Sequence, residues 1–298
     1  MRIEFEEVTP KHNKIKKVTI VILVILFIAM FGVLGIYYAK LNNFNFTSIL
    51  NIKNSYKENI EETTQNKIED EKNLNMQLPK YTKNSQKQMN NIYNSKTKIA
   101  YLTFDDGPSQ AVTPLILDVL KEQNIKATFF VLGTYVKRNP ELVKRAYEEG
   151  HYIANHGYSH NYEKIYKNAN NVLEEYKKTE KAIQEAIGIK EYSSYLFRFP
   201  GGYSGSSYAK VKKQAANLLN KNNISYIDWN VLTGDAQGAN TKDKILKNIK
   251  KYTANKGNIV VLMHDSSSKI LTYETLTDVI NYLKNEGYTF DNFYNIMK

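Results

Sequence analysis

Two acidic residues and three histidines are the side chains of this chain best suited to hydrolytic chemistry. Asp105 and Asp106 end the apolar run in TFDDG, His156 and His160 are spaced by four residues, and His264 ends VVLMH. A histidine pair at this spacing lies on one face of a helical turn and can hold one ion. A histidine after an apolar strand can be a general acid. The simpler alternatives are a turn at Asp-Asp-Gly-Pro, polar loop histidines and a buried structural histidine.

Composition limits the kind of site. The chain has 298 residues, no cysteine and only five histidines. Disulfides, thiolate nucleophiles and Cys-ligated zinc are therefore excluded, and a donor set of His, Asp and Glu suits zinc and other divalent ions. We interpret His151 as structural. The net charge of +11 suits an anionic polymer or lipid, or reflects a lysine-rich surface. No zinc-finger spacing or aromatic RNA-binding strand occurs, so we expect no nucleic-acid partner.

Segments typical of strands and of helices alternate from about residue 96. Apolar runs that suit buried parallel strands occupy 98–104, 126–133, 151–157, 195–202, 225–231, 258–265 and, more weakly, 287–293. Helical spacing lies between them, at 110–123, 140–150, 163–187, 206–222, 241–254 and 273–286. This alternation predicts a parallel sheet with helical crossovers. About seven strands in roughly 200 residues favour a (β/α) barrel over an open sheet.

Candidate site residues gather at the carboxyl ends of these runs. They are Asp105, Asp106, His156, Arg198, Trp229 and His264. In a parallel barrel these ends share one face, where barrel active sites lie. Arg198 would orient a carboxylate through a bidentate pair, unless it is a surface residue of a turn. Gly201 and Gly202 would let the backbone approach a ligand. Trp229 would wall a pocket or pack in the core, and Asp235 matters only if it meets a histidine.

The N-terminal part has a different character. Residues 18–39 are uncharged and strongly apolar, and they are long enough to cross a bilayer as one helix. The preceding KHNKIKK segment places the N-terminus in the cytoplasm under the positive-inside rule. A cleaved signal peptide and a buried core helix are the alternatives. We predict a single-pass protein of the cell membrane with four parts: a cytoplasmic N-terminus at 1–17, a transmembrane helix at 18–39, an extracytoplasmic stalk at 40–95 and a catalytic domain at 96–298.

The order of motifs along the chain resembles the polysaccharide deacetylase family, carbohydrate esterase family 4, with its NodB-homology domain. The motifs are TFDDG, ATFFVLG, PELV followed by GHYIANHxxxH, RFPGG, DWNVxxGDA and VVLMHD. The resemblance covers roughly residues 96–290 and implies a distorted parallel (β/α) barrel. It does not extend to the predicted anchor or stalk.

The resemblance implies a role for each residue that matches a family motif. Asp105 would be the general base and His264 the general acid. Arg198 would hold Asp105 in place, and Asp235 would tune His264. One divalent ion, Zn²⁺ or alternatively Co²⁺ or another divalent ion, would be bound by Asp106, His156 and His160. Three protein ligands with an open fourth position are typical of a catalytic ion.

The resemblance also implies a substrate groove. Its lining would consist of Pro200, Gly202, Tyr203, Trp229 and Leu262. A backbone N–H near Tyr203 would help to stabilise the oxyanion. Two departures from the family pattern bear on the site. Gly157 stands where the family usually has Ser or Thr, which concerns the stiffness of the metal loop. Leu232 and Ala236 replace an acid and a tryptophan of the fourth motif, so the groove near Ala236 would be more open.

The function implied by the resemblance is removal of N-acetyl groups from an extracytoplasmic glycan. Peptidoglycan is the expected substrate, at N-acetylglucosamine or N-acetylmuramic acid. The same groups would serve an O-acetyl esterase, and a catalytically inactive wall-binding protein is the remaining alternative. An inactive relative should lack catalytic or metal-binding residues, and all five are present here. We expect a monomer whose partners are the glycan and the membrane.

Overall fold

The structure is a computed structural model that describes residues 30 and 32, residues 78–205 and residues 207–297. Within these residues no helix is long and apolar enough to cross a membrane. The predicted transmembrane segment 18–39 lies outside the described residues, apart from 30 and 32. The predicted cytoplasmic N-terminus and the predicted stalk up to residue 77 lie outside them as well. These assignments therefore stay predictions.

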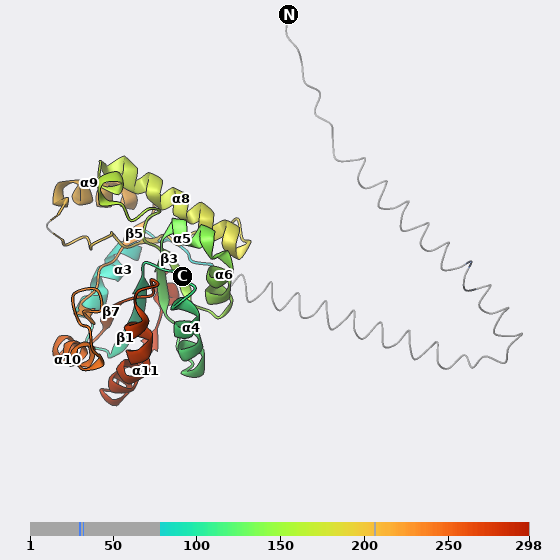
Figure 1. Ribbon diagram of the computed structural model, residues 1–298. Helices are drawn as coiled ribbons and strands as arrows, with labels where there is room; N and C mark the ends of the chain where they lie inside the picture. The colour runs from blue at the N-terminus through green and yellow to red at the C-terminus, as the bar shows by residue number, and fades with distance from the viewer. Residues whose placement is uncertain (1–29, 31, 33–77, 206, 298) are drawn as a thin grey trace, which may run out of the picture. The chain divides into compact units, whose positions relative to one another are not determined.

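The strands of the described part form one parallel sheet (Figure 1). They are β1 Ile99–Asp105, β2 Thr128–Val131, β3 Tyr152–Asn155, β4 Leu196–Phe197, β5 Ser225–Tyr226, β6 Val231–Leu232, β7 Ile259–His264 and β8 Thr289–Asp291. The order across the sheet is β5-β4-β3-β2-β1-β7-β6, and β8 pairs with β1. The predicted parallel sheet is confirmed, with eight strands among the described residues where about seven were expected.

β1 lies in the middle of the sheet, and its register sets the level of the site residues. Asp105 is paired with Phe130 of β2 on one side and with His264 of β7 on the other. β8 lies beside residues 99–101 and β2 beside residues 103–105, so these two short strands share one side of β1. The carboxyl ends of β1 and β7 therefore lie at the same level of the sheet, as expected if the candidate site residues at these ends form one site.

The run 225–231, predicted as one strand, forms two. Its polar residues explain the break: Asp228 accepts a hydrogen bond from the N–H of Tyr203, and Asn230 accepts one from the N–H of Val260. These contacts draw the chain out of strand geometry between β5 and β6. The two strands lie at opposite ends of the strand order and, within the described residues, do not pair. The sheet is thus a curled half-barrel, which fits the predicted distorted (β/α) barrel.

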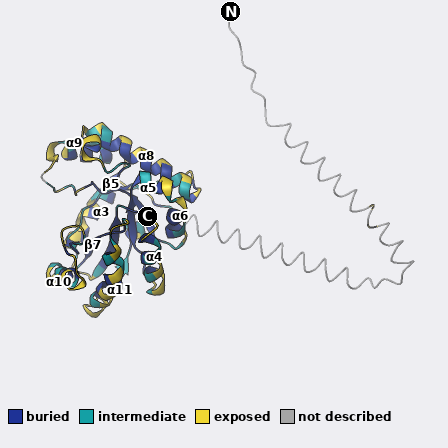
Figure 2. Ribbon diagram, viewed as in Figure 1, coloured by how far each residue is buried: buried dark blue, intermediate teal, exposed yellow. Residues whose placement is uncertain are grey.

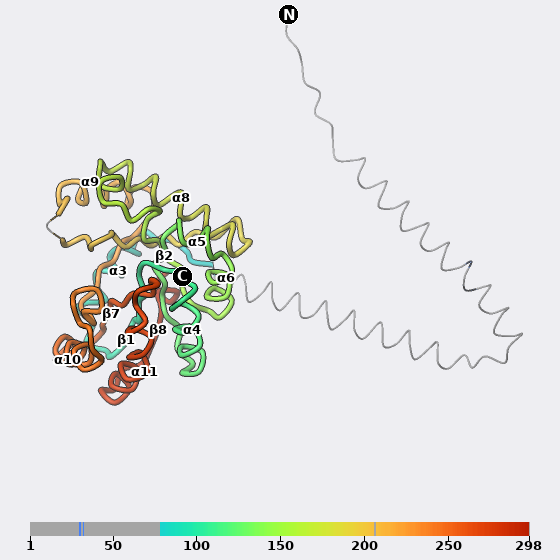
Figure 3. The backbone as a smooth tube through the Cα atoms, viewed as in Figure 1, coloured from blue at the N-terminus to red at the C-terminus, as the bar shows by residue number. Residues whose placement is uncertain are grey.

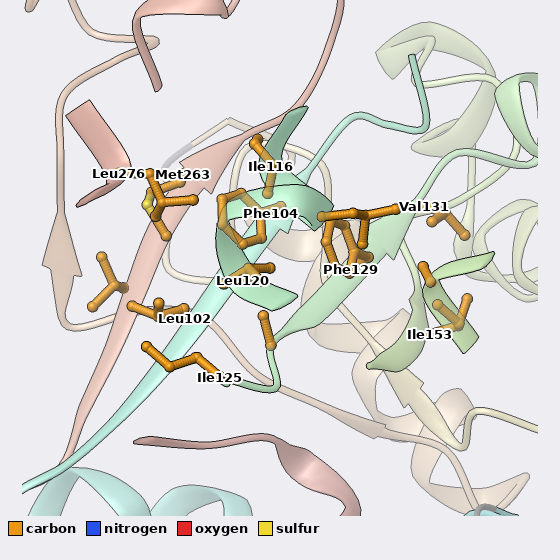
Figure 4. Packing of buried hydrophobic residues seen from close by; sticks show 14 of the residues in the cluster. Leu102, Phe104, Ile116, Leu120, Ile125, Phe129, Val131, Ile153, Met263 and Leu276 are labelled. Atoms are coloured by element: carbon orange, nitrogen blue, oxygen red, sulfur yellow. The ribbon is translucent and has the colours of Figure 1, made fainter. Parts of the chain in front are cut away.

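Helices pack against the sheet (Figures 1 and 3). They are α4 Thr113–Glu122, α5 Gly133–Arg138, α6 Pro140–Glu148, α7 Tyr162–Ile165, α8 Ala169–Ile187, α9 Ala209–Lys221, α10 Lys242–Thr253 and α11 Ile270–Asn285. α7 and α9 pack in a separate cluster with α8 and β4, and the other helices, together with α8, enclose the main core. The rings of Phe104 and Phe129 stack at 5.1 Å, with Ile116 and Leu120 of α4 in the same cluster (Figure 4). The exposed residues of these helices face away from the sheet (Figure 2).

The helix predicted at 163–187 is interrupted. α7 ends at Ile165 and α8 begins at Ala169, because the side chain of Asn168 accepts the N–H of Asn171 and caps α8. α8 ends at Gly188, which takes the left-handed conformation (φ 77°) that glycine adopts without strain. The short helix α5 was not predicted at all.

Residues 78–95 fold as part of the domain, so the predicted stalk boundary at residue 95 is wrong. They form α3 Ser85–Asn91 and the 3₁₀ helix η1 Ile92–Asn94. Met89 and Ile92 are buried in a second cluster with residues of β1, β2, β3, β4 and β7. The Gln86 side chain donates to the carbonyl of Tyr226 and accepts its N–H, so it completes the free edge of β5. α3 was missed because Met89 is its only apolar residue.

Candidate active site

Asp105, at the end of β1, is held by a buried arginine. Nη1 of Arg198 donates to its Oδ1 at 2.9 Å and to Oγ1 of Thr103 at 2.7 Å. The other guanidinium nitrogens donate to the carbonyls of Ile227 and Asp228. The expected bidentate pair is therefore wrong: one nitrogen serves the carboxylate and the others serve the backbone. Because Arg198 is fully buried and bonded on all sides, it is a fixed positive charge beside Asp105.

The side chains of Asp106, His156 and His160 converge on one point. Oδ1 of Asp106 lies 3.5 Å from Nε2 of His156 and 3.3 Å from Nε2 of His160. The three candidate ligand atoms lie within 4.8 Å of one another. Oδ1 of Asp106 is buried and has no hydrogen-bond partner among the described residues. A buried carboxylate oxygen facing two imidazole nitrogens fits a divalent cation.

The histidine pair does not lie on a helical turn, which corrects the sequence-based interpretation. β3 ends at Asn155, and α7 begins only at Tyr162. The intervening loop turns sharply, because Gly157 (φ 85°) and His160 (φ 52°) both take left-handed backbone conformations. A glycine suits the first of these positions. The loop, not helical periodicity, brings the two rings to 5.3 Å between centroids.

Hydrogen bonds leave Nε2 of His156 free for a ligand. Nδ1 of this ring is 2.8 Å from the carbonyl of Arg198, which can only accept, so Nδ1 carries the proton. Burial lowers the pKa of His156 to about 3, although the charge of Asp106 opposes the shift. The imidazole is therefore neutral, which is the form that binds metal ions.

Glu175 of α8 supports the histidine loop and was not identified from the sequence. Its Oε2 accepts the backbone N–H groups of Tyr158 and Ser159, both at 2.7 Å, and its Oε1 accepts the Ser159 hydroxyl at 2.9 Å. The side chain is buried. Its position on the apolar face of α8, between Val172 and Thr179, could have revealed it. A carboxylate buried there needs hydrogen-bond partners.

His264, at the end of β7, is paired with Asp235. Nδ1 lies 2.9 Å from Oδ1 of Asp235, and the backbone N–H of His264 donates to Oδ2 at 2.8 Å. The Thr272 hydroxyl also donates to Oδ2, and Lys269 donates to the Asp235 carbonyl. Asp235 therefore has the histidine partner without which it would be an ordinary loop acid.

These contacts set the charge of His264. Burial by itself lowers the pKa of the ring, but the hydrogen bond and charge of Asp235, with the charges of Asp105 and Asp106, raise it to about 9. His264 therefore carries a proton at neutral pH. For Asp105 burial is the largest cause and raises the pKa of the carboxyl, while Arg198 and His264 act in the opposite direction. The site thus holds a carboxylate and an imidazolium with shifted pKa values.

Asp265 is a second buried acid that the sequence did not reveal as important. Its Oδ2 accepts the Thr113 hydroxyl at 2.6 Å, and its N–H donates to the carbonyl of Asp105. A Cβ at Gly107 would come within 2.1 Å of the same carboxyl, so only glycine fits there. Burial raises the pKa of Asp265 to about 7. The residue packs under the turn that carries Asp106.

His151 lies at the start of β3, away from the carboxyl ends of the strands. It is buried, and its Nδ1 accepts the N–H of Ala127 at 3.0 Å. Burial lowers its pKa to about 3, so the ring is neutral. These contacts agree with the structural role expected for it.

The residues predicted to line the substrate groove differ in their contacts. Gly202 (φ 76°) lies so close to Trp229 that a Cβ would come within 3.0 Å of the indole. The Pro200 carbonyl accepts the Tyr166 hydroxyl, and Leu262 is buried on β7 two residues before His264. The N–H of Tyr203 donates to Asp228 at 2.7 Å. It is therefore engaged in the structure and does not point freely at an oxyanion, contrary to the expectation.

The chain is similar to known proteins over this same part. A family model described as polysaccharide deacetylase matches residues 92–222. A peptidoglycan-N-acetylglucosamine deacetylase of Bacillus cereus is 34% identical over 199 residues, which cover 65% of this chain and 85% of that protein. The peptidoglycan-N-acetylglucosamine deacetylase PgdA of Listeria monocytogenes is 38% identical over 189 residues, which cover 63% of this chain and 36% of that protein.

A solved structure agrees with these matches. A Streptococcus mutans CE4 esterase has a TM-score of 0.64 and 31% sequence identity, over 72% of this chain and 92% of that chain. The expected family is thereby confirmed, on both sequence and structure. This chain belongs to the polysaccharide deacetylase family.

Proposed function

We propose that this chain is a hydrolase that removes N-acetyl groups from a cell-wall glycan, with the N-acetylglucosamine of peptidoglycan as the substrate. One arrangement carries the proposal: three convergent side chains that can bind a metal ion lie at the same strand ends as an arginine-held carboxylate and a carboxylate-held histidine. The choice of sugar is supported by the names of the two curated relatives. N-acetylmuramic acid is the alternative sugar, and product analysis separates the two.

We propose that one divalent ion is held by Asp106, His156 and His160. The unpartnered buried oxygen of Asp106 and the neutral ring of His156 support this assignment. Two nitrogen donors and one oxygen donor suit Zn²⁺, and they also accept Co²⁺. Such an ion would polarise the acetyl carbonyl and lower the pKa of water in the site.

Asp105 is placed to act as the general base. Its Oδ1 is occupied by Arg198, which leaves Oδ2, 3.8 Å from Nε2 of His156, to take a proton from the attacking water. The raised pKa of Asp105 makes it a better proton acceptor than an ordinary aspartate. Because Arg198 fixes one oxygen, the other keeps its direction.

His264 is placed to act as the general acid. Its Nδ1 is held by Asp235, so Nε2 is the atom that can give a proton to the departing amine nitrogen as the C–N bond breaks. With a pKa of about 9, the ring carries that proton at neutral pH. Acetate and a free amino sugar are the products.

We further propose that the domain acts outside the cell, where residues 18–39 anchor it in the membrane. The support is the uncharged apolar sequence of that segment and the lysines before it. Labelling of the full chain in intact cells with a membrane-impermeant amine reagent tests this. Modification of the lysines beyond residue 77 is expected, and protection of all of them would overturn the assignment.

Acetate release by the full chain tests the proposed reaction. Zinc- or cobalt-loaded protein should release acetate from peptidoglycan or from N-acetylglucosamine oligomers, and mass spectrometry of the muropeptides should show which sugar has lost its acetyl group. Parallel assays on O-acetylated xylan distinguish an esterase, since the same groups could serve an ester. Absence of acetate from every N-acetylated substrate, with metal bound, would overturn the proposal.

A further inference from the structure

A pocket of about 750 Å³ lies at the end of the sheet opposite to the candidate active site. We call it the basal pocket, because its lining comes from residues that precede β1, β6, β7 and β8, and parallel strands all begin at one end of a sheet. None of the candidate active-site residues lines it. Its volume lies within the range of small-ligand sites, about 300–1,000 Å³. The polar part of its lining includes Asn94, Lys96, Lys98, Asn255, Lys256 and Glu286.

The two segments that carry Lys96 and Lys256 are far apart in the chain, and their backbones are joined at the basal pocket. The N–H of Asn258 donates to the carbonyl of Ser95 at 3.3 Å. A Cβ at Gly257 would come within 2.0 Å of the Ser95 carbonyl oxygen, so only glycine permits this approach. The backbone therefore holds two lysines against one pocket.

The side chains of Lys96 and Lys256 have no ion-pair or hydrogen-bond partner among the described residues. Lys98 differs from them, because its ammonium donates to the Glu286 carbonyl at 2.6 Å and lies 5.4 Å from the centre of the Tyr288 ring. Glu286 is the one acid of the lining. Two ammonium groups in one pocket repel each other, and an anion bound between them turns this repulsion into attraction. The pocket is thus suited to an anion.

The chain around these lysines is poor in acids. Between residues 78 and 104 it has no acid, and between residues 241 and 257 it has only Asp243. The lysines of these two segments are Lys80, Lys83, Lys87, Lys96, Lys98, Lys242, Lys244, Lys247, Lys250, Lys251 and Lys256. In α6 and α8, by contrast, Lys144 pairs with Glu148 and Lys181 with Glu185. The excess of positive charge on the pocket segments attracts anions from solution.

The lining favours phosphate over carboxylate as the anion. It contains lysines and no arginine, whose planar fork is the usual partner of a carboxylate, whereas an ammonium binds phosphate as a point charge. The side-chain amides of Asn94 and Asn255 supply further donors for phosphate oxygens. A recess of this size admits a flexible chain more readily than the flat surface of a bilayer, which favours a polymer over a lipid surface.

We propose that the basal pocket binds the phosphate groups of an anionic phosphodiester polymer, with Lys96 and Lys256 as the main contacts. Such binding holds the domain on the polymer and leaves the opposite end of the sheet free for the glycan. The inference does not depend on the proposed reaction, because the pocket and the candidate active site share no residue.

Calorimetric titration with short poly(glycerol phosphate) tests the inference on the full chain, held in nanodiscs of neutral phosphatidylcholine. Lys96→Gln combined with Lys256→Gln should weaken binding about thirtyfold, from the loss of two lysines beside phosphate groups. Lys144→Gln combined with Lys181→Gln is the matched control, because it removes the same charge from two ion-paired lysines elsewhere. The control should bind within about twofold of the unmodified chain. Equal weakening in both double variants would mean that only net charge matters, and would overturn the proposal.

Two other probes test the choice of ligand. Polyglutamate carries carboxylates in place of phosphates, and binding as tight as that of poly(glycerol phosphate) would overturn the assignment to phosphate. Phosphatidylglycerol vesicles present phosphates on a lipid surface. Vesicle binding that is lost in Lys96→Gln/Lys256→Gln, while binding of the polymer persists, would overturn the polymer as the partner.

Acetate release separates this inference from the proposed function. Lys96→Gln/Lys256→Gln should keep the kcat of the unmodified chain on N-acetylglucosamine oligomers and should unfold at the same temperature, so that weaker polymer binding reports the pocket and not the fold. If the unmodified chain releases acetate but does not bind the polymer, the pocket assignment is overturned and the proposed reaction stands. If it binds the polymer through the two lysines and releases no acetate, the reverse holds.

Discussion

Two buried carboxylate–cation pairs flank the Asp106–His156–His160 cluster, and the proposed reacting group is the anion in one pair and the cation in the other. At β1, Arg198 is the fixed partner and Asp105 would react. At β7, Asp235 is the fixed partner and His264 would react. Each pair joins one nitrogen and one carboxylate oxygen at 2.9 Å, and the side chains of both pairs are buried.

The difference lies in where the remaining hydrogen bonds go. Arg198 also donates to Thr103 and to two backbone carbonyls, and Asp235 also accepts the Thr272 hydroxyl and a backbone N–H. The partner with these extra bonds is immobilised, and the partner with a free atom can exchange a proton. Under the proposed function, the same kind of ion pair would provide a base or an acid, depending on which member has its hydrogen-bonding atoms occupied by the fold.

The largest effect is expected from removing the base. Asp105→Asn should lower kcat for acetate release by about 10²–10⁴-fold, because an amide cannot take the water's proton. Zinc content, measured by atomic absorption, should stay near one ion per chain, since the metal-binding side chains are untouched. Loss of the zinc along with the activity would mean that Asp105 is itself a ligand, and the comparison between the two pairs would fail.

A smaller effect is expected from removing the acid, and it should depend on the leaving group. His264→Gln should lower kcat for an N-acetylated oligomer by about 10²-fold, but for an activated acetyl ester by much less, because a phenolate leaves without a proton. Rates on both substrates provide the measurement. Equal losses on amide and ester would show that His264 does something other than protonate the amine.

The two pairs should also appear as the two limbs of the pH profile. Activity needs ionised Asp105, so it is lost as pH falls through the pKa of that carboxyl, and it needs protonated His264, so it is lost as pH rises through about 9. Asp235→Asn removes the anion that raises the pKa of His264. A return toward the ordinary value of about 6.5 would cut the protonated fraction at about pH 8 roughly thirtyfold.

In that variant the acidic limb should move less than the alkaline limb, since Arg198, the largest charge acting on Asp105, is unchanged. The profile of kcat across the pH range that contains both limbs is the measurement that checks it. An alkaline limb that does not move would assign it to another group and separate Asp235 from the acid.

The smallest effect is expected from a carboxylate that holds the loop and belongs to neither pair. Glu175→Gln keeps the shape but weakens the bonds to the N–H groups of Tyr158 and Ser159. Zinc affinity should fall about tenfold, the lower end for outer contacts of a metal site. Competition with a fluorescent chelator measures it. A shift of either limb of the pH profile would show that the histidine loop is coupled to Asp105 or His264. It would contradict the view that Glu175 acts separately from the two ion pairs.

Much of this arrangement could be predicted from the sequence. The apolar runs that became β1 and β7, the turn residues after them and the histidine spacing all lie within short stretches, and their order matched a family pattern. Local pattern suffices there, because a buried parallel strand needs a continuous apolar run and its end needs turn chemistry. The site residues at the ends of β1 and β7 were placed at one level for the same reason.

Other features depended on groups far apart in the chain. Arg198 meets Asp105 across 93 residues and Asp235 meets His264 across 29, while Glu175 and the Tyr203 N–H found partners that no local pattern marks. α3 shows the reason most clearly. Its sequence is polar, and it is ordered because Met89 fills a space that exists only once the sheet has curled and left β5 and β6 unpaired. The sequence by itself determined which residues could react, and the tertiary structure decided which of their neighbours hold them, because burial and hydrogen-bond partners arise only when distant segments pack together.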